Sequence, residues 1–72
     1  MGGMTTTRPI RITTDAISTT LQATCGDDAA RQFAASEGIA ASDAAELCEH
    51  YREIGGTIRI IDTDGAVLCR VA

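Results

Sequence analysis

The segment TIRIIDTDGAVLCRV, residues 57–71, holds two short β-branched and apolar runs on either side of the tetrapeptide DTDG. Runs of this composition bounded by turn residues are typical of β-strands. Asp at the first position of a turn, and Gly where positive φ is needed, favour a tight reversal of the chain. The segment therefore predicts a C-terminal β-hairpin.

Two turn lengths suit this hairpin, and they differ in which side chains meet across the strands. A two-residue turn at Asp64 and Gly65 would set Arg59 directly opposite Arg70, and like charges in that position are unfavourable. We therefore expect a four-residue turn. It divides the side chains between one face with Ile58, Ile60, Val67, Cys69 and Val71 and a second face with Arg59, Ile61, Leu68 and Arg70.

The residues before the hairpin predict one more strand and several helical turns. In RPIRIT, residues 8–13, isoleucine alternates with arginine, and Pro9 suits a sheet edge or the first residue of a strand. Asp27 or Asp28 can cap a helix that Gly38 ends. The segment 15–24 has apolar residues at helical spacing, and we expect it to be helical despite its threonines.

The most regular helical pattern lies between residue 42 and Gly55. Ser42 or Asp43 can cap it, and Glu46 stands where a capping box places its acid. The apolar side chains fall within an arc of about 120°: Ala44, Leu47, Cys48, Tyr51 and Ile54. The opposite arc holds Asp43, Glu46, Glu49, His50 and Glu53. The pattern predicts an amphipathic helix with an acidic outer face.

These elements together predict a small single α+β domain over residues 8–72. Its order is β-α-(α)-α-β-β, with the helices packed on one face of a three-stranded sheet that ends in the C-terminal hairpin. Residues 1–7 are polar and threonine-rich, and we expect a disordered N-terminus that is partly derived from a tag.

The three cysteines bear on the compartment of the protein. Cys25, Cys48 and Cys69 are odd in number, widely spaced and without a CxxC pair, whereas a secreted disulfide scaffold normally carries an even number. We expect three unpaired thiols in a reducing cytoplasm and no metal site. No apolar run is long enough to span a bilayer, so no membrane contact is expected.

The segment IIDTDGAVL, residues 60–68, resembles the first motif of the haloacid-dehalogenase-like phosphatases. That resemblance implies a nucleophilic Asp62 and a general acid at Asp64. The family also needs a lysine to balance the phosphate charge, and this chain has none. A calcium loop would need Gly three residues after a second acid and a glutamate at its end, which are missing here. We interpret DTDG as a turn and expect neither an enzyme nor a cofactor.

Charge is the sequence's clearest indication of function. The net charge is −4, and the stretch from Asp15 to Glu53 has eight carboxylates against two arginines. This balance argues against direct DNA binding, which needs a basic footprint. An acidic surface can instead occupy a basic groove of a protein partner. The candidate contact residues are Asp43, Glu46, Glu49 and Glu53.

In size, acidity and its lone α+β domain the chain resembles the small acidic inhibitor proteins of phages and mobile elements, of which anti-CRISPR proteins are an example. The resemblance implies an inhibitor that blocks the nucleic-acid path of a larger complex. Two alternatives stay open. One is a self-assembling accessory or antitoxin-like module that forms a homodimer. The other is RNA binding through a sheet face bearing Arg8, Arg11, Arg59 and Arg70.

Overall fold

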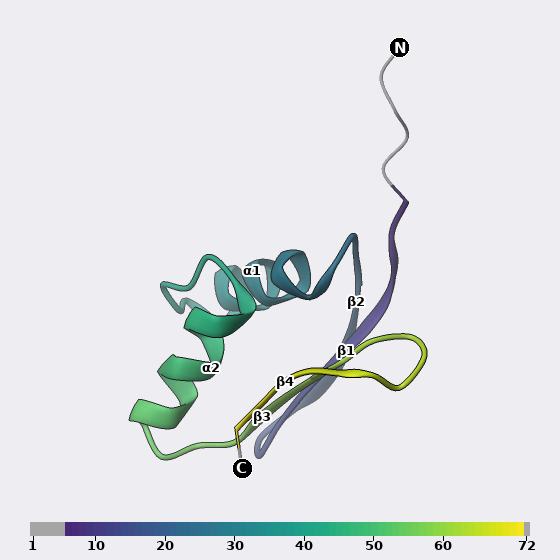
Figure 1. Ribbon diagram of the computed structural model, residues 1–72. Coiled ribbons are helices and arrows are strands. Elements are labelled where there is room, and N and C mark those ends of the chain that lie inside the picture. Colours follow the sequence, from purple (N-terminus) through teal and green to yellow (C-terminus); the bar gives the residue numbers. More distant parts are fainter. Residues whose placement is uncertain (1–5, 72) are drawn as a thin grey trace.

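The computed structural model describes residues 6–71 and arranges them in a sheet covered by two helices (Figure 1). The elements in chain order are β1 (Arg8–Thr14), β2 (Ser18–Ala23), α1 (Gly26–Glu37), α2 (Ala44–Glu53), β3 (Ile58–Ile61) and β4 (Val67–Val71). The strands form one antiparallel sheet in the order β2-β1-β3-β4. The α+β class is confirmed, and the predictions for residues 1–5 and 72 lie outside the described residues.

The sheet has four strands and not three, because the segment expected to be helical forms β2. The turn between β1 and β2 is closed by the Thr14 hydroxyl, which accepts hydrogen bonds from the backbone N–H groups of Ala16 and Ile17 at 3.1 Å. Threonines favour strands because their branched side chains pack well on a pleated surface. The actual order is therefore β-β-α-α-β-β.

Pro9 lies near the start of β1, although β1 is a central strand. It faces Gln22 of β2, whereas pairing with β3 begins only at Arg11. At Pro9 the strand thus has one neighbour, and the missing N–H group removes no hydrogen bond to β3. Pro9 is the second residue of β1 and not the first, and the expected edge position is met only locally, where β3 does not reach.

The β3–β4 hairpin turns at DTDG as expected, but its register differs from the expected one. Gly65, with φ of 88°, donates its N–H to the Asp62 carbonyl, and Asp62 donates to the Ala66 carbonyl, both at 2.9 Å. This arrangement is typical of a type I turn followed by a left-handed glycine. Arg59 lies directly opposite Arg70, so the expectation that the hairpin avoids this pair is wrong.

A β-bulge explains the difference in the faces of β4. The register shifts between Ile60 and Ile61, so Ile61 faces Val67 and Ile60 faces Cys69, which leaves Leu68 as the extra residue. Val67 is 53% exposed instead of buried. Leu68 lies against Gly26, where an added Cβ would come within 2.7 Å of Leu68 Cδ1. The expected positions of Val67 and Leu68 were both wrong, because a bulge reverses the alternation.

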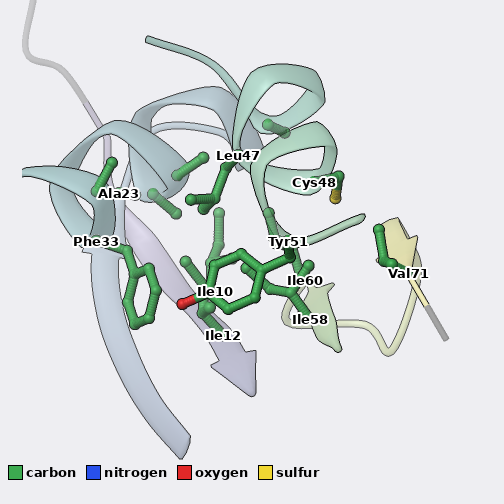
Figure 2. Packing of buried hydrophobic residues seen from close by; sticks show 14 residues of the cluster. Ile10, Ile12, Ala23, Phe33, Leu47, Cys48, Tyr51, Ile58, Ile60 and Val71 are labelled. Carbon is green, nitrogen blue, oxygen red and sulfur yellow. The ribbon is translucent and has the colours of Figure 1, made fainter. Parts of the chain in front are cut away.

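The core lies between the sheet and the helices (Figure 2). Its largest fully buried side chains come from β1, α2 and β3: Ile10, Ile12, Leu47, Ile58 and Ile60. The rings of Phe33 from α1 and Tyr51 from α2 close one side of this cluster (Figure 2). Burying an isoleucine or leucine stabilises the fold by about 1.5–3 kcal/mol, so these few residues supply much of its stability.

Cys48 on α2 and Cys69 on β4 are joined as a disulfide, with 6.8 Å between their Cα atoms. That separation lies at the upper end of the disulfide range. The expectation of unpaired thiols is therefore wrong for this pair, whereas Cys25 is free and exposed. The two residues are 21 positions apart and meet only because α2 packs on β4.

Reducing the Cys48–Cys69 bond is expected to lower the free energy of unfolding by about 3 kcal/mol, as loop-closure entropy predicts for a loop of this size. Denaturant unfolding with and without a reductant measures the difference. Thiol titration of the unreduced protein should count Cys25 alone, and all three cysteines should react after reduction. Cys25→Ser is the matched control and should respond to reductant as the parent does. Three reactive thiols before reduction would contradict the pairing.

Candidate interaction surfaces

The acidic row on α2, defined as Asp43, Glu46, Glu49 and Glu53, begins with two carboxylates that also start the helix. Asp43 is the N-cap, and its Oδ1 accepts the Glu46 N–H at 2.8 Å. Glu46 Oε1 accepts from the backbone N–H of Ser42 at 2.7 Å and from its hydroxyl at 2.6 Å. The expected cap at Asp43 is confirmed, but the glutamate of the box returns to Ser42, one residue before the N-cap, and not to the N–H of Asp43. These hydrogen bonds, that from the hydroxyl first, lower the pKa of Glu46.

The second half of the acidic row is exposed and contributes less to the stability of the fold. Glu49 forms an ion pair with Arg52 on the next turn, and both side chains are more than half exposed. An exposed pair of this kind contributes little to stability. Glu53 makes no side-chain hydrogen bond or ion pair within residues 6–71. Glu49 and Glu53 are therefore the carboxylates most available to a partner.

Two carboxylates of α1, not assigned to a binding site by sequence reasoning, hold the helical layer in place. Asp27 Oδ1 accepts the Ala44 N–H at 3.0 Å, which satisfies a backbone donor in the first turn of α2. Asp28 Oδ2 accepts the Thr24 N–H at 2.9 Å, and this bond is the main reason that the pKa of Asp28 is lowered. The expectation that Asp27 or Asp28 caps α1 is wrong, because the N-cap is Cys25 and has no side-chain cap hydrogen bond, and both acids lie in the first turn of the helix.

His50 lies at the side of the acidic row. It is half-buried, and its ring meets that of Tyr51 edge to face with 5.5 Å between centroids. Burial and the nearby charges of Glu37 and Asp15 raise the pKa of Tyr51. The contact gives His50 a packing role.

The four arginines of the strands do not share one face. Arg8 has the parity of the buried Ile10 and reaches the β3–β4 turn, where Nε lies 2.6 Å from Asp62 Oδ1 and Nη2 lies 2.7 Å from Oδ2. Its Nη1 also donates to the Thr24 carbonyl at 2.8 Å. This bidentate pair is a strong, orienting interaction. Arg8 is a structural residue of the turn.

The open sheet face, which no helix covers, carries the remaining three: Arg11, Arg59 and Arg70. All are exposed and alternate with buried residues along their strands. A hollow of about 290 Å³ lies where the end of β1, the start of β3 and the end of β4 meet. Its lining residues are Thr13, Thr14, Thr57, Ile58, Arg59, Arg70 and Val71. A second hollow of about 350 Å³ near Arg11 also contains Asp62.

The DTDG carboxylates are both engaged by the turn. Asp62 is held by Arg8 and accepts the Thr63 N–H at 2.7 Å, and these interactions, with Arg8 first, lower its pKa to about 2. Asp64 accepts the Ala66 N–H at 3.0 Å. Among the described residues, no three His, Cys, Asp or Glu side chains gather into a group that would hold a metal ion.

No protein-family model, curated protein or solved structure matches this chain. In the part of the chain that the structure describes, neither α1 nor α2 is long and apolar enough to cross a membrane. The acidic row and the open sheet face are the two surfaces on which exposed charges of one sign gather.

Replacing Asp62 by Asn should destabilise the protein at neutral pH and reduce its sensitivity to acid. The folded pKa of about 2 lies below the ordinary value of 3.8, so the stabilising contribution is present above pH 3.8 and is lost as the pH falls through 2. Denaturant midpoints measured between pH 7 and pH 2 test this. Asp64→Asn is the matched control in the same turn and should keep the parent's acid response. An unchanged profile for Asp62→Asn would refute the role of the Arg8 pair.

Asp43→Ala should lower the free energy of unfolding by about 1 kcal/mol because it removes the N-cap of α2. Asp43→Asn removes the same charge but keeps a good cap, so its stability should stay close to that of the parent. Urea unfolding of the three proteins separates the capping role from the charge. Equal losses in both variants would show that charge, and not capping, is what Asp43 contributes.

Proposed function

We propose that this chain is a non-catalytic interaction protein whose acidic row occupies a basic surface on a larger, nucleic-acid-binding partner and so inhibits it. The observation that carries the proposal is the row itself. Glu46, Glu49 and Glu53 follow one another along a single exposed face of α2. Their separations along the helix axis are about 4.5 and 6 Å, so the row offers a partner a regular line of negative charges in place of phosphates.

The distribution of charge over the two faces supports this proposal. The helical layer has seven carboxylates against Arg31 and Arg52, whereas the open sheet face carries arginines. A molecule divided in this way is oriented by the field of a charged partner before contact, which raises the association rate. The helices would face the partner's basic groove.

The start of the row is preorganised. Asp43 and Glu46 are held in place by the capping box, so little side-chain freedom remains to be lost on binding. The lowered pKa of Glu46 also keeps it ionised in mild acid. Glu49 and Glu53 would then contribute the adaptable contacts.

Binding is favoured over catalysis because the carboxylates of DTDG are committed to the turn. A partner of the proposed kind works in the cytoplasm, and the proposal implies that location. The Cys48–Cys69 disulfide does not support a cytoplasmic location for the protein, because thiols are kept reduced in the cytoplasm.

Self-association is the second candidate, and the free edge of β2 favours it. The homodimer hypothesis placed the edge near Pro9, but β1 is central and β2 pairs with β1 alone. The outer edge of β2 could pair with a second copy before Gln22, whereas the Gln22 carbonyl already accepts from Gln32 and Ala23 is buried. Light scattering over a range of concentrations distinguishes this candidate from a monomeric inhibitor.

The double variant Glu49→Arg/Glu53→Arg should abolish capture of the partner from host extract while the protein stays folded. The control Asp15→Arg/Asp64→Arg makes the same change in net charge at the hairpin turns and should keep capture. The captured protein should bind nucleic acid, and the parent chain should compete with that nucleic acid. Equal capture by both double variants would show that the acidic row is not the contact.

A further inference from the structure

We propose that the hollow that Arg59 and Arg70 help to line, beside the open sheet face, is a binding site for the phosphate group of a small phosphorylated molecule. The site lies on the opposite side of the sheet from the acidic helices and does not depend on the function proposed for them. It is built from the strand pairing, the hydroxyl groups around it and the absence of an opposing carboxylate.

The first observation is the arginine pair itself. Arg59 and Arg70 lie directly opposite each other in the β3–β4 register, and both are exposed. Side chains in that position have Cβ atoms about 4.5–5.5 Å apart, where like charges are destabilising. Neither guanidinium has a hydrogen bond or ion pair within residues 6–71. An anion held between them would turn this repulsion into attraction.

The fold gains nothing evident from the pair, because the neighbouring positions supply the packing. Ile58 faces Val71 on one side of it and Ile60 faces Cys69 on the other, and three of these four residues are buried. Arg59 and Arg70 point away from that core. Both guanidinium groups are therefore free to bind a ligand from outside the fold.

The second observation is the set of hydroxyl groups in the same hollow. Thr13 lies opposite Arg59 on β1, and its Oγ1 shares a hydrogen bond with Ser18 Oγ at 3.1 Å. Thr57 adds a hydroxyl without a hydrogen bond among the described residues. Thr14 also lines the hollow, but its hydroxyl is taken up by the β1–β2 turn. Two hydroxyls can thus complement two guanidinium groups.

The donor set favours phosphate over carboxylate. Each guanidinium presents a fork of N–H donors that matches two oxygens. A phosphate monoester has three terminal oxygens, which can accept from both arginines and from a threonine at once, whereas a carboxylate has two. No carboxylate lines this hollow, while Asp62 lines the one near Arg11 and would oppose an anion there.

The dimensions and the lining narrow the class of ligand. A volume of about 290 Å³ is near the low end for small-molecule sites, and it leaves room beside the phosphate for the group it is attached to. The only Phe and Tyr, Phe33 and Tyr51, are buried beneath the helices, so the open sheet face offers no ring on which bases could stack. A small phosphomonoester fits these features better than a nucleic-acid strand.

Thermal unfolding with inorganic phosphate or AMP, against chloride at matched ionic strength, tests the site. We expect the Tm to rise by about 9 °C when either anion is at tenfold its dissociation constant. Equal affinities would identify free phosphate as the ligand, and tighter binding of AMP would identify a phosphomonoester. No rise with either anion would overturn the proposal.

Arg59→Gln and Arg70→Gln should each abolish the rise in Tm. Their own Tm without anion should be equal to or above that of the parent, because one of two repelling charges is gone. Arg11→Gln is the matched control outside the hollow and should keep the response. A response kept by the Arg59 and Arg70 variants, or lost equally in Arg11→Gln, would refute the site.

The last measurement is the affinity of the protein for a single-stranded oligonucleotide. If it binds more tightly than AMP, with an affinity that falls steeply with salt, the open sheet face is a nucleic-acid surface and the small-molecule site is wrong. These outcomes are independent of the acidic row, because the variants of Glu49 and Glu53 leave the hollow unchanged and the arginine variants leave α2 unchanged.

Discussion

The pairing of β1 with β3 is the interaction on which the rest of this structure depends. It joins two hairpins from opposite ends of the described chain, and a two-stranded hairpin alone is at best marginally stable in water. Ile12 faces Ile60 across the joint, and neither side chain is exposed. Once this register is set, alternation along the strands places Arg11 and Arg59 on the open sheet face and turns Arg8 towards Asp62.

Local patterns predicted the elements whose signals lie within one turn or one helix. The DTDG turn and the cap of α2 depend on residues a few positions apart, and both were found where expected. The segment that forms β2 was misassigned because Ile17 and Leu21 have helical spacing, although its threonines favour a strand. The bulge at Leu68 leaves no mark in the apolar pattern, so the register of the last hairpin was wrong.

The candidate surfaces could be predicted only where they depend on residues close together in the sequence. The acidic row follows from helical periodicity, which needs only local sequence. Other charged side chains have hydrogen-bond partners that are distant in the sequence. Asp27 bonds Ala44, 17 positions away, and Arg8 bonds Asp62, 54 positions away. No pattern in one sequence identifies such pairs. Arg8 was therefore grouped with exposed arginines, and the disulfide of Cys48 with Cys69 was missed.

The two surfaces differ in how the fold treats their charges. Most acids of the helical layer have internal donors, because helix starts present unpaired N–H groups that carboxylates satisfy. Arg59 and Arg70 have no carboxylate at the neighbouring strand positions, where the residues are apolar or threonine. The start of the acidic row is therefore held in place within the free protein. The arginine pair is a local excess of positive charge, and the proposed anion would relieve its repulsion.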